Sequence, residues 1–290
     1  MSGNVKTLIT GSKGMLGSGF EVHFNNGIVK GYSRSNLDIN NDQQISKVLE
    51  LEKPDIIIHT AAFTDVDGCE KNKDKAYLVN TVGTMNLVKY CIDKNVLLVF
   101  ISSTGIYGSA NHSEQYNEFD FVNPASIHHK SKYEAEKIIE RHLNKFLIIR
   151  TGWLFGGHKN HNKNFVYKRY LEAKSQNEIY SDDSQIGNPT YTVDLVEQIK
   201  LLINCGHYGT FNCVNKAKNI SRFDYVKKII ELFDLSTNLK SSSSDKFDRV
   251  APVSKNESAI NYKLDLLGIN IMGDWELSLS KYIEKLKGDL

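Results

Sequence analysis

Three glycines near the start of the chain have the spacing of a phosphate-binding loop. Gly11, Gly14 and Gly17 lie in the run Thr-Gly-Ser-Lys-Gly-Met-Leu-Gly, after an apolar segment and before an amphipathic one. The first glycine permits a tight turn, the second lets the backbone approach a pyrophosphate, and the third lets helix and strand pack closely. Free N–H groups at the start of the helix would then face the phosphates. The sequence therefore predicts a dinucleotide site here rather than a merely structural turn.

A basic residue follows the segment that is expected to form the second strand. An acidic side chain at this place would bind the ribose 2′-hydroxyl of NAD, but the chain reads Gly31-Tyr32-Ser33-Arg34. Arg34 could instead stack on adenine and hold a 2′-phosphate. The alternative is a surface arginine that contacts only solvent. The pattern favours NADP(H) as cofactor and leaves NAD(H) open.

Alternating strand and helix patterns must position these groups. Apolar runs predict five buried strands, at about 5–10, 28–32, 55–59, 96–102 and 146–150. Helical spacing predicts the segments between them, at about 15–25, 41–52, 74–94 and 132–143. Fully apolar strands separated by helices are typical of a parallel sheet that is covered on both faces.

The pattern loosens after Gly156, which predicts a second, smaller lobe. Its expected helices lie at about 164–173, 192–204 and 221–233, its strands near 178–180 and 209–214, and a loop at 241–244. The predicted fold is α/β, a Rossmann-type doubly wound parallel sheet with a smaller C-terminal substrate lobe. Residues 1–155 would form the dinucleotide-binding domain, to which about 190–215 would return, and 156–290 mainly the substrate-binding lobe. The site should lie in the cleft between them.

Composition and charge narrow the class of protein. The 290 residues are 40% hydrophobic and 24% charged with a net charge of +2, which is ordinary for a globular enzyme and indicates neither a nucleic-acid nor a membrane partner. No apolar run approaches the roughly 20 residues of a membrane span, and no signal peptide is recognised, so a cytoplasmic location is expected. The cysteines and histidines lack the spacing of metal ligands, so no metal is predicted.

Several segments resemble the extended short-chain dehydrogenases, and among them the dTDP-4-dehydrorhamnose reductase family. The likeness covers roughly residues 5 to 235 and fades over 249–264. The matching segments, in order, are 10–17, Leu37-Asp38-Ile39, 54–67, Val79-Asn80, Asn123-Pro124, Ser131-Lys132, 150–156, Asn164-Phe165-Val166 and 183–191.

This resemblance implies NADP(H)-dependent reduction of a 4-keto sugar nucleotide, in nucleotide-sugar and surface-polysaccharide biosynthesis. It implies cofactor contacts at Gly11, Gly14, Met15, Leu16, Gly17, Ser33, Arg34, Asp38, Ile39, Ala61, Ala62, Thr64, Asn80 and Lys132. It implies substrate contacts at Thr64, Val66, Ser103, Trp153, Asn164 and Gln185. For Trp153, packing between the lobes is the alternative. The expected partner is the nucleotide-sugar substrate, and the fold is compatible with a homodimer.

The proton donor of this family is a tyrosine, and the matching position here holds His128. The other two catalytic groups of short-chain reductases, a hydroxyl and a lysine, match Ser103 and Lys132. An imidazolium with a pKa of about 6.5 could donate a proton, but the charge of a nearby lysine would lower that pKa. Tyr133 and Lys137 also fit Tyr-x-x-x-Lys. That register differs by five residues, a rotation of about 140° away from the face that carries the family's lysine.

Three functions stay open on this reasoning. The chain could be a reductase that uses His128 or another group as proton donor. It could catalyse another sugar-nucleotide reaction of the epimerase or dehydratase type. It could also be a catalytically impaired homologue that keeps the dinucleotide for a regulatory or structural purpose. The retained Ser103 and Lys132 favour chemistry, whereas the missing tyrosine favours the impaired homologue.

Overall fold

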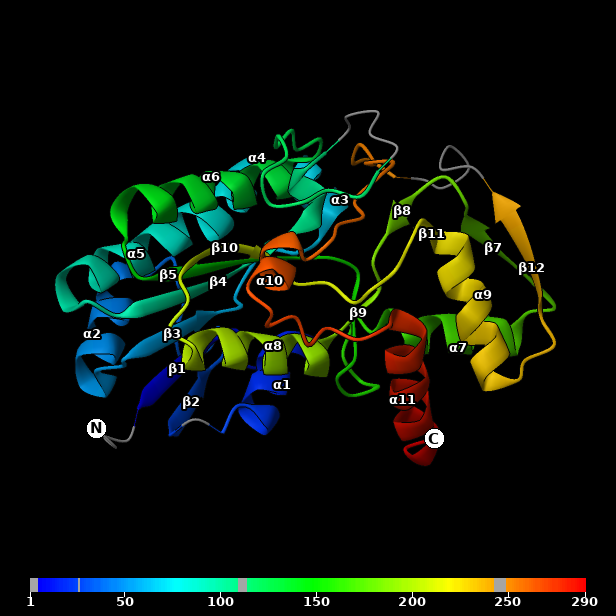
Figure 1. The fold of residues 1–290 in the computed structure, drawn as a ribbon, viewed down its shortest axis with the longest axis horizontal. Helices are drawn as coiled ribbons and strands as arrows, with labels where there is room; N and C mark the ends of the chain where they lie inside the picture. Colours follow the sequence, from blue (N-terminus) through cyan, green and yellow to red (C-terminus); the bar gives the residue numbers. More distant parts are fainter. Residues whose placement is uncertain (1–4, 26, 109–113, 243–248) are drawn as a thin grey trace.

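Six parallel strands form the centre of the computed structural model, which describes residues 5–25, 27–108, 114–242 and 249–290. The strands lie in the order β10-β5-β4-β3-β1-β2 (Figure 1). Their bounds are β1 Lys6–Thr10, β2 Ile28–Tyr32, β3 Ile56–His59, β4 Leu97–Ser103, β5 Phe146–Thr151 and β10 Gly209–Asn212. The order reverses between β1 and β3, and such a switch point opens a ligand crevice at the carboxyl ends of the strands.

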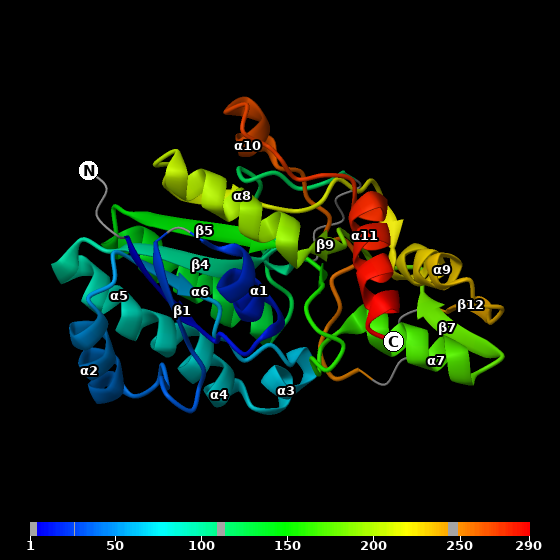
Figure 2. The same ribbon diagram turned by 90° about the horizontal axis from the view of Figure 1, so that it is seen from below.

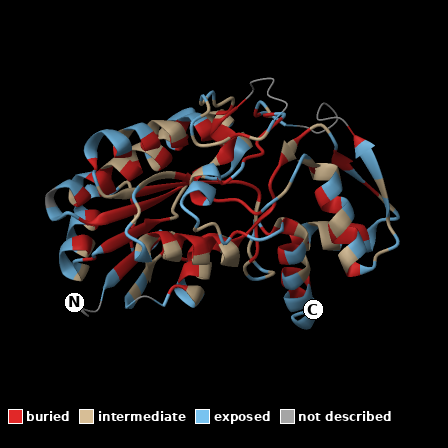
Figure 3. Cartoon of the chain, in the orientation of Figure 1, coloured by how far each residue is buried: buried red, intermediate tan, exposed pale blue. Residues whose placement is uncertain are grey.

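Helices cover both faces of this sheet (Figures 1 and 2). One face carries α1 (Met15–His23) and α8 (Thr192–Asn204), and the other carries α2 (Asp42–Glu52), α5 (Gly83–Lys94) and α6 (Ile127–His142). Successive residues of β3 enter opposite cores: Ile56 and Ile58 pack with α1 and α8, and Ile57 packs with the other helices. This burial on both faces, visible in Figure 3, explains the continuous apolar runs and confirms the predicted doubly wound α/β fold.

A smaller lobe stands beside the sheet (Figure 1). Three of its helices, α7 (Phe165–Ser175), α9 (Arg222–Phe233) and α11 (Trp275–Gly288), enclose an aromatic core. Its strand pairs are β7 (Glu178–Asp182) with β12 (Asn238–Ser242), β8 (Ile186–Gly187) with β11 (Ile220–Ser221), and β6 (Leu154–Phe155) with β9 (Thr190–Tyr191). The short α10 (Tyr262–Leu266) precedes α11 in the chain. Within the described ranges, no helix has the length and apolar character needed to cross a bilayer.

Two predicted helices differ from the structure in ways that affect the site. The helix expected at 132–143 begins at Ile127, because the Ser126 side chain accepts a hydrogen bond from the backbone N–H of His129 and caps the first turn. The helix expected at 74–94 consists of α4 (Lys73–Tyr77), a π-helical turn (Leu78–Val82) and α5, and the short α3 (Val66–Lys71) precedes it.

The predicted loop at 241–244 is also wrong for its first half. Ser241 and Ser242 belong to β12, which pairs in parallel with β7. Ser243 and Ser244 lie outside the described residues. A run of serines carries no apolar alternation, so the strand is set by its partner rather than by local pattern.

A buried ion pair fixes α6 to the sheet. On β5, Arg150 Nη2 donates to Glu136 Oε2 at 2.8 Å and its Nε donates to the same oxygen at 3.2 Å. The side chains of Arg150 and Glu136 are 6% and 0% exposed. Arg150 Nη1 also donates to the Tyr107 hydroxyl, which in turn donates to Asn212. Because a charge without water needs a charged partner, this pair sets the rotation of α6 about its axis.

Glu136→Gln should lower the free energy of unfolding by about 3 kcal/mol, because it leaves the Arg150 guanidinium buried without its carboxylate. Glu134→Gln breaks an exposed pair with Lys137 on the same helix and should cost less than about 0.5 kcal/mol. Urea unfolding of both variants measures the difference. A loss for Glu136→Gln no larger than that of the matched control would contradict the anchoring role.

Candidate functional site

A cavity of about 1160 Å³ lies between the carboxyl ends of the strands and the smaller lobe. Pockets for one small ligand usually have about 300 to 1000 Å³, so this cavity has room for a cofactor and a substrate together. The predicted site residues that line it are Gly11, Gly14, Met15, Leu16, Gly17, Ser33, Arg34, Asp38, Ile39, Ala61, Ala62, Thr64, Val66, Ser103, His128, Lys132, Trp153 and Gln185.

The glycine loop packs directly against the chain that follows β3. Gly11 has φ 71°, and a Cβ there would lie 2.7 Å from the backbone N of Ala61. A Cβ at Gly17 would lie 2.3 Å from the carbonyl oxygen of Gly11. Gly14 precedes α1 without a side-chain capping hydrogen bond. The N–H groups at the start of α1 are therefore available to the phosphates of a ligand.

Hydroxyl groups and a guanidinium gather at the end of β2. Ser33 Oγ is 2.8 Å from Ser35 Oγ, and Arg34 Nε lies 3.7 Å from Asp38 Oδ2. The Arg34 side chain is 76% exposed, so it can change rotamer and turn toward a ligand at little cost in free energy. This combination of donors fits a phosphate group.

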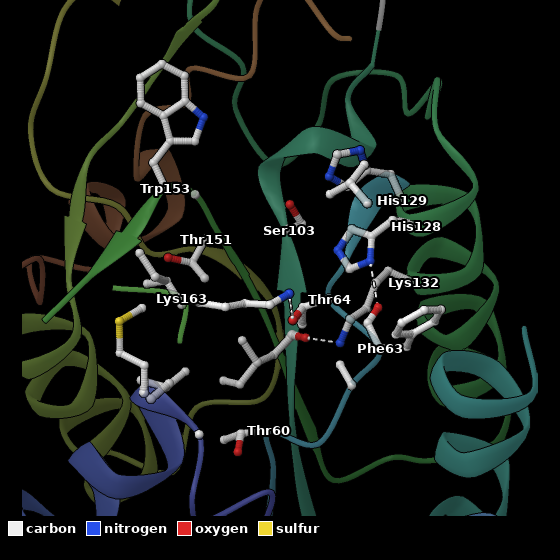
Figure 4. A pocket seen from close by; sticks show the side chains of 18 of the residues that line it. Thr60, Phe63, Thr64, Ser103, His128, His129, Lys132, Thr151, Trp153 and Lys163 are labelled. Carbon is white, nitrogen blue, oxygen red and sulfur yellow. Dashed lines mark hydrogen bonds between the residues drawn. The ribbon is translucent and has the colours of Figure 1, made fainter. Parts of the chain in front are cut away.

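Helix α6 presents His128 and Lys132 to the cavity, four residues apart on one face. Lys132 Nζ donates to the carbonyl oxygen of Ile101 at 2.8 Å and lies 4.5 Å from the centre of the Phe100 ring. Burial lowers the pKa of Lys132 to about 8. Ser103, at the end of β4, lies across the same space (Figure 4).

The imidazole of His128 is neutral and carries its hydrogen on Nδ1. This nitrogen is 3.1 Å from the carbonyl oxygen of Phe63, which can only accept a hydrogen bond. His128 is 7% exposed, and burial, followed by the charges of His129 and Lys132, holds its pKa well below the usual 6.5. At neutral pH the Nε2 of His128 is therefore a hydrogen-bond acceptor.

A second buried histidine bridges the switch point of the sheet. His59 Nδ1 is 2.7 Å from Thr10 Oγ1, and its Nε2 is 3.1 Å from Thr84 Oγ1. Burial lowers the pKa of His59 to about 3, so this ring also stays neutral. It ties the ends of β1 and β3 together beneath the cavity without adding charge.

Two predicted contact residues, Asn80 and Asn164, do not line the cavity. Asn80 accepts from the backbone N of Phe63 at 2.8 Å and donates to Ser131 Oγ at 2.9 Å, so it joins the chain after β3 to α6. Asn164 caps α7 and donates to the Tyr282 hydroxyl at 2.6 Å. Both amides bond to protein groups, which favours positioning roles, and their contact with a ligand stays a prediction.

The alternative pair Tyr133 and Lys137 also lies away from the cavity lining. Lys137 Nζ bonds to Glu134 on the exposed side of α6 and lies 5.2 Å from the Tyr133 ring. The rotation expected from the five-residue shift accounts for this placement.

The structure adds charged residues of the smaller lobe that the sequence reasoning did not assign to the site. They are Lys163, Arg169, Arg222 and Glu257, and Arg249 from the segment of fading resemblance joins them. The centre of the Arg222 guanidinium stacks 3.5 Å from the Trp153 ring, whose Nε1 donates to Glu257 at 3.2 Å. Burial lowers the pKa of Arg222 to about 10, which still leaves it positive at neutral pH. No local pattern marks these residues, because their contacts join distant segments.

His129 fills the space beside Gly105. A Cβ at Gly105 would lie 2.2 Å from Cε1 and Nε2 of the imidazole. Ser126 Oγ is 3.0 Å from His129 Nδ1, and the ring stands edge-on to His128 with centroids 5.1 Å apart. Burial lowers the pKa of His129 as well. The small residue at 105 and the large one at 129 are therefore complementary.

Comparisons with known proteins agree on one family. The chain matches the family model described as RmlD substrate binding domain over residues 5–287. A dTDP-4-dehydrorhamnose reductase from Bacillus anthracis, solved in complex with NADP, has a TM-score of 0.93 and 32% identity and covers 98% of this chain and 100% of its own. A dTDP-4-dehydrorhamnose reductase from Clostridium acetobutylicum has a TM-score of 0.93 and 33% identity, with the same coverage. The spore coat polysaccharide biosynthesis protein SpsK of Bacillus subtilis is 27% identical over 97% of both chains.

Gly105→Ala should lower the free energy of unfolding by about 2 kcal/mol, because the new methyl group overlaps the His129 ring. In a His129→Ala background the same change should cost less than about 0.5 kcal/mol, since the space is then open. Urea unfolding of the four proteins completes the double-mutant cycle. An equal loss of unfolding free energy for Gly105→Ala in the wild type and in His129→Ala would show that the two residues do not depend on each other.

Proposed function

The chain belongs to the RmlD substrate binding domain family, and from this premise we propose that it reduces the 4-keto group of a dTDP-linked deoxysugar with NADPH. One observation carries the proposal. A single cavity runs from the glycine loop to the arginines of the smaller lobe, with Ser103 and Lys132 between them. The relatives named as dTDP-4-dehydrorhamnose reductases, one solved with NADP, support the same reaction.

The sheet end of the cavity fits NADPH. Its pyrophosphate would lie at the start of α1, where Gly14 leaves the N–H groups free, and its 2′-phosphate would lie against Ser33 and Arg34. Lys132 would hold the nicotinamide ribose. Bound in this way, NADPH supplies the hydride. The residues of the chain bind and orient it.

The other end of the cavity fits a sugar nucleotide. Arg222 offers a half-buried positive charge there, and Arg249 Nη1 donates to Gln185 Oε1 at 3.4 Å. Guanidinium groups in such a setting bind diphosphates well. The Trp153 ring, stacked on Arg222, forms the wall between the diphosphate and the sugar. The sugar ketone would then lie near Ser103, whose hydroxyl polarises it.

A nucleotide-binding homologue without catalysis is the second candidate. It is favoured by the neutral state of His128, because a neutral imidazole is a poor proton donor. The retained cavity, with Ser103 and Lys132 in place, favours the reductase. A homodimer, a cytoplasmic location and the boundary at 155/156 stay predictions. The name of the Bacillus subtilis relative supports a role in surface-polysaccharide synthesis.

The wild-type protein should oxidise NADPH when dTDP-4-dehydro-6-deoxy-L-mannose is added, and absorbance at the NADPH band measures this. His128→Tyr serves as the comparison, because it restores the residue that the family uses. Activity in the variant alone, with both ligands still bound by the wild type, would replace the reductase proposal with the impaired homologue.

Arg34→Ala should weaken NADPH binding by about 10- to 100-fold, because it removes a charge-assisted contact to the 2′-phosphate. NADH has no such phosphate, so its affinity should change by less than about twofold. Lys47→Ala removes an equal charge from the exposed face of α2 and is the matched control. Cofactor fluorescence titration gives all of these affinities. An equal loss for both cofactors would refute the assignment of Arg34.

A further inference from the structure

Reduction of a ketone needs a proton as well as a hydride, and three side-chain nitrogens surround the centre of the cavity. They belong to His128, Lys132 and Lys163, which lie around one space with Ser103 above them (Figure 4). The hydrogen bonds and charges of each nitrogen determine which of them can give up a proton at neutral pH.

His128 and Lys132 are both poorly suited to this task. His128 presents an unprotonated Nε2, because its Nδ1–H is committed to the carbonyl of Phe63 and its pKa is well below 6.5. Lys132 donates to the carbonyl of Ile101 and lies against the Phe100 ring, which directs its ammonium toward the sheet. Its place beside the bound ribose would occupy its remaining hydrogens.

Lys163 reaches the same space from the smaller lobe. It lies just before α7, and its Nζ donates to Thr64 Oγ1 at 2.6 Å although the two residues are 99 positions apart. Figure 4 shows this side chain extended across the cavity to Thr64, on the side where His128 lies and below Ser103. Its charge also contributes to the lowered pKa of His128, which agrees with their proximity. Lys163 is open to solvent, so it can recover a proton after each turnover.

The surroundings of Lys163 adjust its acidity. Partial removal of water lowers its pKa below 10.5, and Lys168 of α7 acts in the same direction. Asp65, the N-cap of α3, and Cys69 within α3 oppose that shift. The charged group therefore stays an ammonium ion at neutral pH while its pKa moves toward the range in which general acids work well.

We propose that Lys163, not His128, is the catalytic proton donor of this chain, and the proposal rests on the reductase function. The hydride that bound NADPH would supply forms the new C–H bond, and the carbonyl π electrons move to the ketone oxygen. That oxygen takes a proton from the Lys163 ammonium, which breaks an N–H bond and leaves a neutral amine and NADP⁺. A proton from solvent then restores the ammonium, so that the ketone, NADPH and one proton become the alcohol and NADP⁺. Thr64 is the positioning residue, because its hydroxyl accepts one hydrogen of the ammonium and leaves two for the ketone.

Three substitutions of lysine test the assignment in the full-length protein. Lys163→Met should lower kcat by at least about 100-fold, the usual contribution of a general acid. Lys163→Arg keeps the positive charge, but a guanidinium has a pKa above about 12 and gives up its proton poorly. Its kcat should therefore fall by a similar factor. Lys159→Met, in the same loop but outside the cavity lining, should keep wild-type kcat. The affinity for NADPH should stay within about twofold in all three.

Several results would overturn the proposal. One is a kcat for Lys163→Met within threefold of the wild type, and another is full activity of Lys163→Arg, which would assign the role to charge alone. A third is a loss explained by weaker NADPH binding. A fourth is a greater loss of kcat in His128→Asn than in Lys163→Met. A wild type that oxidises no NADPH would instead overturn the reductase function itself.

The pH dependence gives an independent check. With an ammonium donor, kcat does not change between pH 6 and 7.5, and it falls at higher pH as Lys163 gives up its proton. An imidazolium donor would instead lose the rate as the pH rises through the pKa of His128, at or below about 6.5. Titration by ¹⁵N NMR measures the protonation of the His128 and Lys163 side chains in the absence of turnover.

We expect His128 to stay neutral with Nδ1–H from pH 6 to 8 and Lys163 to titrate below 10.5. A His128 that titrates at 6.5 or above would refute the proposal.

Discussion

The buried pair between Glu136 and Arg150 is the constraint on which the site depends. Residues four apart on α6 form one row toward the sheet, and Glu136 is the member of that row that is tied to β5. One turn earlier, Lys132 bonds to the carbonyl of Ile101 on β4. A further turn earlier, His128 bonds to the chain after β3. A rotation of α6 would break all three contacts at once, so the ion pair determines where His128 and Lys132 stand in the cavity.

Electrostatics explains how a histidine can occupy the tyrosine position without becoming charged. Burial is the main cause that lowers the pKa of His128, and the charges of Lys132 and Lys163 act in the same direction. The same positive charges, continued by Arg222 at the far end of the cavity, suit the phosphates of a dinucleotide and a sugar nucleotide. The positive field that would suit two anionic ligands therefore also disfavours a proton on the buried imidazole.

The sequence predicted those parts of the site that depend on local structure. The glycine loop requires only a turn between a strand and a helix, so Gly11, Gly14 and Gly17 were predictable from their spacing. The start of α6 was placed five residues too late, because its signal is a single capping side chain at Ser126. Lys163 and Glu257 were not predicted as site residues, because their contacts, to Thr64 and Trp153, span 99 and 104 residues. No periodic pattern encodes a pairing that exists only when two lobes meet.

A proton donor at Lys163 has a consequence for how the two lobes work together. NADPH would lie on the sheet side of the cavity, on the groups of the glycine loop, whereas Lys163 belongs to the chain that leads into α7 of the smaller lobe. Hydride and proton would then approach the ketone from different lobes. A tyrosine on α6 would keep both on the same lobe. The hydrogen bond from Lys163 to Thr64 joins the two lobes at the cavity. Reduction of the ketone by this chain would therefore require the lobes to be docked as they are here.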